Sequence, residues 1–71
     1  MEYIVDFLWD NEAAVWIAES DNIPGLVLES GSLDALVEKV RFAVPELLSL
    51  NNTDKHQPIN LLIKTERQVV I

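Results

Sequence analysis

Carboxylates are the chemically active side chains that dominate the first half of this 71-residue sequence. The first 38 residues contain nine Asp and Glu and no Lys or Arg, and all five basic residues lie between Lys39 and Arg67. Nucleic-acid binding depends on Lys and Arg displacing counterions from phosphates, whereas an acidic surface attracts and steers a basic protein. The charge pattern therefore predicts a positively charged protein partner and argues against direct DNA binding.

The candidate contacts for that partner come from the predicted strands and turns. Trp16 is included because Trp is enriched at binding hot spots, although Trp9 and Trp16 are equally good candidates for the core of a chain this small. The net charge of −7 also has a simpler interpretation, since it keeps a small protein soluble without any partner. The absence of Lys and Arg from half the chain favours binding. The candidate contacts are Asp10, Glu12, Trp16, Glu19, Asp21 and Glu29.

Other catalytic and metal-binding residue types are sparse. The sequence has no Cys and a single His, His56, which lies in the polar segment 51–58. General acid–base catalysis needs a second group that the sequence does not place beside this histidine, so His56 is interpreted as a surface loop residue. Gly31 lacks the repeated glycines of a phosphate-binding loop. We therefore predict a domain that is not an enzyme and that has no cofactor and no metal.

Length and composition indicate one small domain, residues 1–71. At this size folding buries only about 60% of the surface that the unfolded chain exposes, and without disulfides self-association remains as a way to add stability. No stretch approaches the roughly 18 consecutive apolar residues of a membrane span, and Glu2 and Asp6 are unlike a signal peptide. The sequence predicts a soluble, cytoplasmic protein that forms a homo-oligomer, most simply a dimer.

Hydrophobic periodicity predicts three strands, one helix and a fourth strand. Residues 3–9 and 13–19 form a hairpin around a polar turn, and Pro24-Gly25 turns the chain into a short strand at 26–29. Ser32 is expected to cap an amphipathic helix from residue 33 to about residue 50, kinked or broken at Pro45. Residues 59–65 alternate as the last strand, and the apolar residues 69–71 beyond it are expected to pair or pack.

This order of elements predicts an α+β fold, a β-β-β-α-β two-layer sandwich. Three antiparallel strands, a helix across one face and a fourth strand parallel to the first give the sheet order 3-2-1-4 by the right-handed crossover rule. The other face has no helix, and its apolar content exceeds that of ordinary water-facing strands. This excess again predicts a subunit interface, with candidate residues Ile4, Leu8, Trp16, Ala18 and Leu62.

Residues 14–36 resemble the HicB-like domain of bacterial antitoxins. As in that family, an aromatic-containing strand, a turn at Ile23-Pro24-Gly25 and a short strand lead to Gly31-Ser32 and an amphipathic helix. The sequence Phe-Ala-Val-Pro-Glu-Leu at 42–47 is similar to a HicB-related family of short bacterial proteins that is named only as a domain of unknown function. The resemblance covers nearly the whole chain.

The resemblance implies a partial ribonuclease-H-like fold and an antitoxin function. HicB proteins dock onto a small basic ribonuclease toxin of the HicA type and occlude its RNA-binding surface, so the chain is expected to be an antitoxin or an orphaned antitoxin domain. Full antitoxins also carry a DNA-binding module, which this sequence lacks, and Leu26 stands where HicB-like domains often have Cys.

Two alternatives to an antitoxin remain open. The first is a stand-alone oligomerisation or scaffold domain without a toxin. The second, which we consider weaker, is a metal-dependent nuclease, because ribonuclease-H-like enzymes hold two metals with carboxylates on the first strand and first helix, where Asp6 and Glu38 lie. Such a site needs three or four converging carboxylates, and the other acidic residues are as easily explained by turns and strand ends.

Overall fold

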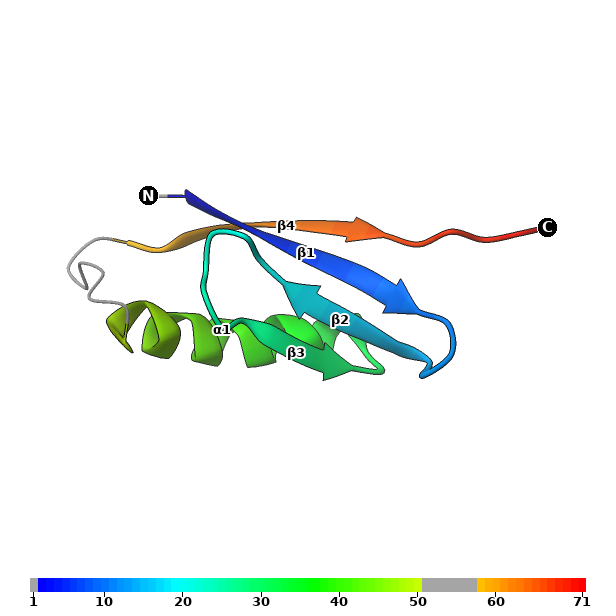
Figure 1. Ribbon diagram of the computed structural model, residues 1–71, viewed down its shortest axis with the longest axis horizontal. Helices are drawn as coiled ribbons and strands as arrows, with labels where there is room; N and C mark the ends of the chain where they lie inside the picture. Colours follow the sequence, from blue (N-terminus) through cyan, green and yellow to red (C-terminus); the bar gives the residue numbers. More distant parts are fainter. Residues whose placement is uncertain (1, 51–57) are drawn as a thin grey trace.

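A four-stranded sheet with one helix on one of its faces makes up the computed structural model, which describes residues 2–50 and 58–71 (Figure 1). The strands β1 (Glu2–Asp10), β2 (Val15–Glu19) and β3 (Val27–Ser30) precede α1 (Leu33–Leu50), and β4 (Asn60–Glu66) follows it. β1 pairs antiparallel with β2 and β2 with β3, whereas β4 is parallel to β1. The sheet order is β3-β2-β1-β4, so the predicted α+β class and strand order are confirmed.

The core lies between the sheet and α1. Strand alternation points every second side chain of β1 and β2 toward the helix, and α1 buries residues spaced by four along its sequence. This spacing is the predicted amphipathic stripe, which therefore packs as expected. The buried residues are Tyr3, Val5, Phe7, Trp16, Ala18, Ile23, Leu26, Leu36, Val40, Val44 and Leu48.

The prediction that Trp16 and Ala18 lie on the helix-free face is wrong. Trp16 lies opposite Trp9 and Ala18 lies opposite Phe7 in the antiparallel register, and residues that lie opposite each other share a face. Trp16 is 9% exposed and Ala18 is fully buried. Periodicity had grouped the side chains of each strand correctly, but it does not say which group the helix covers.

The β1–β2 turn is longer than the sequence predicts, because β2 begins at Val15 and not at residue 13. The Asp10 carboxylate accepts hydrogen bonds from the backbone N–H of Glu12 (3.0 Å) and of Ala13 (3.2 Å), as Asp commonly does in turns. Ala14 has a φ of 56°, a left-handed conformation that costs a residue with a side chain about 1–2 kcal/mol.

α1 begins at the predicted cap and runs through Pro45 without a break. The backbone N–H of Ala35 donates to Ser32 Oγ (3.3 Å), and the N–H of Leu36 donates to the Ser32 carbonyl oxygen (3.0 Å). The predicted single helix ending near residue 50 is confirmed, and the alternative of two helices is excluded. Within the described residues, no helix has the length and apolar character needed to cross a membrane.

Candidate protein-binding surface

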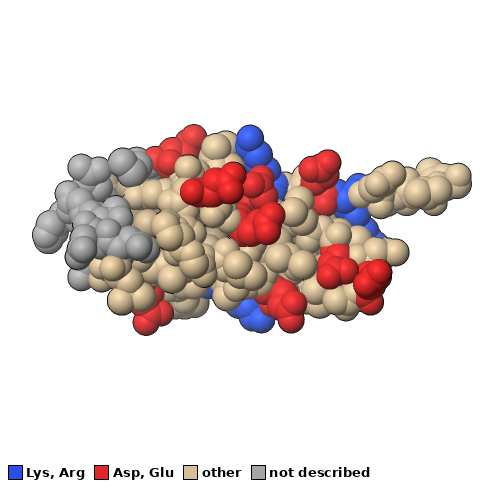
Figure 2. All heavy atoms as spheres, in the orientation of Figure 1, with Lys and Arg blue, Asp and Glu red and all other residues tan. Residues whose placement is uncertain are grey.

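The face of the sheet that α1 leaves uncovered, the open face, carries acidic side chains from all four strands. Figure 2 shows carboxylates spread over the viewed side, with Lys and Arg at its margins. Among the strand positions of the open face, Lys64 is the one basic residue. The register assigns to this face Glu2, Ile4, Asp6, Leu8, Asp10, Val15, Ile17, Glu19, Val27, Glu29, Asn60, Leu62, Lys64 and Glu66.

Three of the carboxylates surround one depression, which we call the acidic hollow. Asp6 of β1 and Glu19 of β2 lie directly opposite each other, and Asp21 follows in the loop after β2. Together with Ser20 and residues 25–27 they line a hollow of about 330 Å³. Glu19 and Asp21 are exposed and Asp6 is half-buried, so the hollow presents its negative charge to solvent.

The loop that carries Asp21 is fixed to β1 by two side chains. Asn22 Oδ1 accepts the backbone N–H of Ile4 at 2.9 Å, and the Ser20 hydroxyl donates to the Ile4 carbonyl oxygen. Ser20 Oγ also accepts the N–H of Asn22 at 3.0 Å. These bonds satisfy the backbone N–H and C=O of Ile4 beyond the end of the β1–β2 pairing, which stops at Asp6 and Glu19. The loop is thereby held beside the carboxylates of the two strands.

A tight turn completes the wall of the acidic hollow. The N–H of Leu26 donates to the Ile23 carbonyl oxygen at 3.2 Å, and Gly25 has a φ of 86°. Pro24 followed by a residue of positive φ is the pattern of a type II turn, in which Gly is preferred. Ile23 and Leu26 are buried on either side of this turn, so the core anchors it.

Apolar side chains lie between the carboxylates of the open face. Leu8 is 36% exposed, Leu62 is 43% exposed and Val27 is 71% exposed. A smaller hollow of about 180 Å³ lies at the β2–β3 side and is lined by Ile17, Val27, Leu28 and Glu29. Exposed apolar groups ringed by polar ones are the usual composition of a protein interface.

The structure brings together two of the six predicted contact residues. Glu19 and Asp21 lie together in the acidic hollow, with Asp6, which had not been predicted as a contact. Glu29 lies on the same face two strands away from β1, whereas Glu12 is exposed in the turn at the other end of β2. Asp10 binds backbone N–H groups of its own turn. Trp16 is buried under α1 and is not available to a partner.

The two carboxylates considered for metal binding are not brought together. Asp6 lies on the open face of β1, and Glu38 lies exposed on α1, where it pairs with Arg41 at 3.4 Å. The described ranges contain no group of three His, Cys, Asp or Glu that could hold a metal ion. His56 falls outside the described residues.

An aromatic and cationic cluster lies where β1, β2 and the end of β4 meet. The rings of Trp9 and Trp16 are 5.3 Å apart between centroids and inclined at 62°, and the Arg67 guanidinium lies 4.1 Å from the centroid of the Trp9 ring. Trp9 Nε1–H donates to Asn11 Oδ1 at 3.3 Å. The sequence does not predict this cluster, because the parallel register of β4 on β1 determines which residue beyond β4 lies over Trp9.

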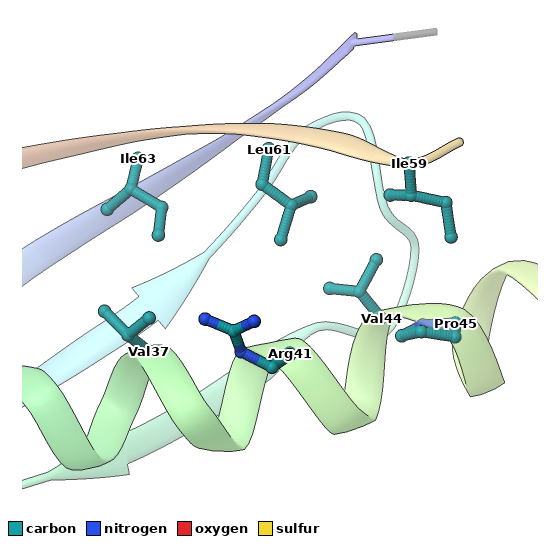
Figure 3. Close-up of a pocket in the computed structure, with 7 residues that line it drawn as sticks. All are labelled: Val37, Arg41, Val44, Pro45, Ile59, Leu61 and Ile63. Carbon is teal, nitrogen blue, oxygen red and sulfur yellow. The ribbon is translucent and has the colours of Figure 1, made fainter.

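A second unpredicted feature is an apolar groove between α1 and β4 (Figure 3). Leu61 and Ile63 of β4 face α1 but are only half-buried, so the inner side of β4 is only half covered. The groove has a volume of about 330 Å³ and is lined by Val37, Arg41, Val44, Pro45, Ile59, Leu61 and Ile63. Figure 3 shows the three β4-side residues pointing toward those of the helix.

Comparison with known proteins gives a family and one similar structure, but no activity. The model of a family described as a domain of unknown function, DUF1902, matches residues 2–71. The crystal structure of a hypothetical protein from the extremely thermophilic bacterium Thermus thermophilus is 41% identical over the whole of both chains, with a TM-score of 0.87. None of the curated proteins matches the chain. Because neither match has a known activity, the evidence on function comes from the surface of the chain itself.

Proposed function

The chain belongs to the DUF1902 family, a domain of unknown function, and from this premise we propose that it is a non-enzymatic protein-binding domain whose open face docks a basic protein. The observation that carries the proposal is the acidic hollow, where Asp6, Glu19 and Asp21 converge from two strands and a loop. In the described part of the chain none of the three forms an ion pair. Lys64 of β4 lies opposite Asp6 in the parallel register and offsets part of its charge, whereas Glu19 and Asp21 lie farther from β4. The hollow keeps a net negative charge, which suits a Lys or Arg side chain of a partner.

The two kinds of side chain on the open face would contribute different parts of binding. Exposed carboxylates are screened by salt, so they act mainly on the association rate and on the choice of partner. Affinity would come from covering Leu8, Val27 and Leu62, because apolar burial is worth about 25 cal/mol per Å² before the costs of association. The same charges disfavour a nucleic acid on this face, since phosphates would be repelled.

The resemblance to HicB-like antitoxin domains identifies the first partner to test, a small basic ribonuclease toxin of the HicA type. In that role the open face would cover the RNA-binding surface of the toxin in the cytoplasm, by steric blocking and charge neutralisation. No bond would be made or broken by this chain. A neighbouring gene that encodes a small basic protein supports the antitoxin role, and its absence supports an orphaned domain.

The proposal is tested with two matched pairs of charge reversals. Glu19→Lys with Glu29→Lys changes the open face, and Glu38→Lys with Glu46→Lys changes the exposed side of α1 by the same net charge. The association rate with the basic neighbour protein, measured by stopped flow at several salt concentrations, is expected to fall and to lose salt dependence only for the open-face pair. Equal effects of both pairs would show that net charge acts without a docking face.

An oligomerisation domain without a toxin is the second candidate, and one observation favours it. Val69 and Val70 follow β4 and are 69% and 88% exposed, although apolar residues at such positions normally pack against something. This role does not exclude a basic partner, because the exposed apolar residues lie beyond the sheet and outside the acidic hollow.

A further inference from the structure

We propose that two copies of this chain join edge to edge through β4, with residues 67–71 of each copy lying along β4 of the other at the open side of the α1–β4 groove. We call residues 67–71 the β4 extension. The proposal stands on the β4 edge, the groove and the extension. It does not depend on the basic partner.

The first observation is that β4 is an edge strand that no described strand covers. It pairs with β1 on one side, and the sheet order places nothing described on its other side. β4 spans seven residues without Pro, whereas β3 at the opposite edge spans four. A long edge strand presents a row of unpaired N–H and C=O groups, which proteins usually cover, because it otherwise recruits another strand.

The second observation is that the last three residues of the β4 extension are apolar and exposed. It runs on from β4 in the same direction and projects beyond the rest of the molecule (Figure 1). Val69, Val70 and Ile71 are all largely exposed. The groove lies beside the preceding residues 59–63 of the same strand, so the extension points away from its own groove and reaches only that of another molecule.

The third observation fixes which way the extension faces. Leu61 and Ile63 point toward α1, and Arg67 continues their alternation, because its guanidinium lies over Trp9 on the same side of the sheet. If the chain stays extended, residues 69 and 71 face the helix layer and residue 70 faces the open side. The groove and the extension therefore offer apolar side chains on the same face.

If a two-fold axis at Glu66 relates the two copies, the apolar side chains of the extension and of the groove lie opposite each other on the helix side of the sheet. In an antiparallel pair of β4 strands centred there, Val69 lies opposite Ile63 of the other copy, and residue 71 lies opposite Leu61. Ile63 and Leu61 line the groove, so the extension of one copy covers the open side of the groove of the other.

The same register also matches the open face. It places Val70, which is 88% exposed, opposite Leu62, which is 43% exposed. Moving the axis by one residue to 65 or 67 places Val70 opposite Asn60 or Lys64 instead. Placing the axis between two residues would bring opposite faces together, because strand side chains alternate. Of these three registers, the axis at residue 66 is the one that pairs apolar with apolar side chains on both faces.

Charge both opposes and supports this arrangement, because like charges directly opposite each other are unfavourable and opposite charges on a diagonal are favourable. The two Glu66 side chains face each other across the axis, and Lys64 of each copy lies diagonal to Glu66 of the other, within the roughly 7–8 Å of diagonal neighbours. The resulting sheet is continuous across the two copies, and their open faces lie on the same side of it. The contact involves fewer residues than the roughly 20–30 a side of a standard interface, so we expect dissociation in the micromolar range.

Sedimentation equilibrium of the full chain tests the extension. Val70→Asp and Val69→Asp should each raise the dimer dissociation constant at least about tenfold, because each dimer carries two copies of the change. Both residues are exposed in the single chain, so folding is not at risk. The matched control is Phe42→Asp, which alters a residue that is 75% exposed on α1 and outside the groove, and it should dissociate like the unmodified chain.

Cysteine cross-linking tests the register. The chain has no Cys, so Glu66→Cys, Thr65→Cys and Arg67→Cys each introduce a single thiol. Under mild oxidation Glu66→Cys should give a covalent dimer fastest, since only that residue meets itself at the axis. The proposal would be overturned if the unmodified chain were monomeric at a protein concentration of about 100 µM, because this lies well above the micromolar dissociation constant expected for a small interface. A dimer that is insensitive to the two Val changes, or one that cross-links faster at residue 65 or 67, would overturn it as well.

Discussion

Gly25 holds the turn between β2 and β3 in a conformation that a side chain resists, and replacing it with Ala should destabilise the protein measurably. Its φ of 86° costs Ala about 1–2 kcal/mol. Ala also reduces the conformational freedom of the unfolded chain, which stabilises the folded state by about 0.4–1 kcal/mol. The new Cβ would lie 3.5 Å from Leu47 Cδ2, an ordinary contact that adds no clash. Gly25→Ala should therefore lower the free energy of unfolding by about 1 kcal/mol, which for a domain of this size lowers Tm by about 4–8 °C.

The matched control is Gly31→Ala. Gly31 is not in the left-handed region, and a Cβ there would lie 4.0 Å from the Ala14 carbonyl oxygen. This variant should be as stable as the unmodified chain or up to about 1 kcal/mol more stable. Urea unfolding followed by Trp fluorescence, at one fixed protein concentration, measures both. A loss of stability at Gly31 equal to that at Gly25, or no loss at Gly25, would refute the assignment of the cost to the backbone.

Three further changes test local features of the fold by the same unfolding assay. Ala14→Gly should stabilise the chain by up to about 1 kcal/mol, because it relieves the φ of 56°; a loss would show that the side chain of Ala14 is needed. Ser32→Ala should cost about 1 kcal/mol through loss of the helix cap, and Ser32→Asp should restore most of it. Arg67→Ala should alter Trp emission while lowering stability by no more than about 1 kcal/mol, since Arg67 is exposed and lies 4.1 Å from the centroid of the Trp9 ring.

Local patterns were sufficient to predict the elements and their order. Ser32 caps α1 as expected, and the positions that alternate in β1 and β4 do alternate between two faces. The errors lie where one local rule competes with another. Ala13 and Ala14 were assigned to a strand by apolar character, but the Asp10 carboxylate binds the following N–H groups and lengthens the turn.

The candidate surface was predicted less well, because it depends on contacts between distant parts of the sequence. Which face of β2 the helix covers decides whether Trp16 is a contact or a core residue, and periodicity is the same in both cases. Asp6 joins Glu19 and Asp21 only through the β1–β2 register and the loop bonds of Ser20 and Asn22. The groove beside β4 depends on the lateral position of α1, which its apolar stripe does not specify.

The proposed function requires that the open face is the docking site, and amide chemical-shift mapping by NMR tests this most directly. The chain, labelled with ¹⁵N, would be titrated with the basic protein encoded beside its gene, or with the basic protein that it captures most strongly from its host. We expect the largest shifts at Asp6, Glu19 and Val27, at the acidic hollow and its apolar edge. Shifts concentrated on α1, or the absence of any basic protein that binds, would contradict the proposed function.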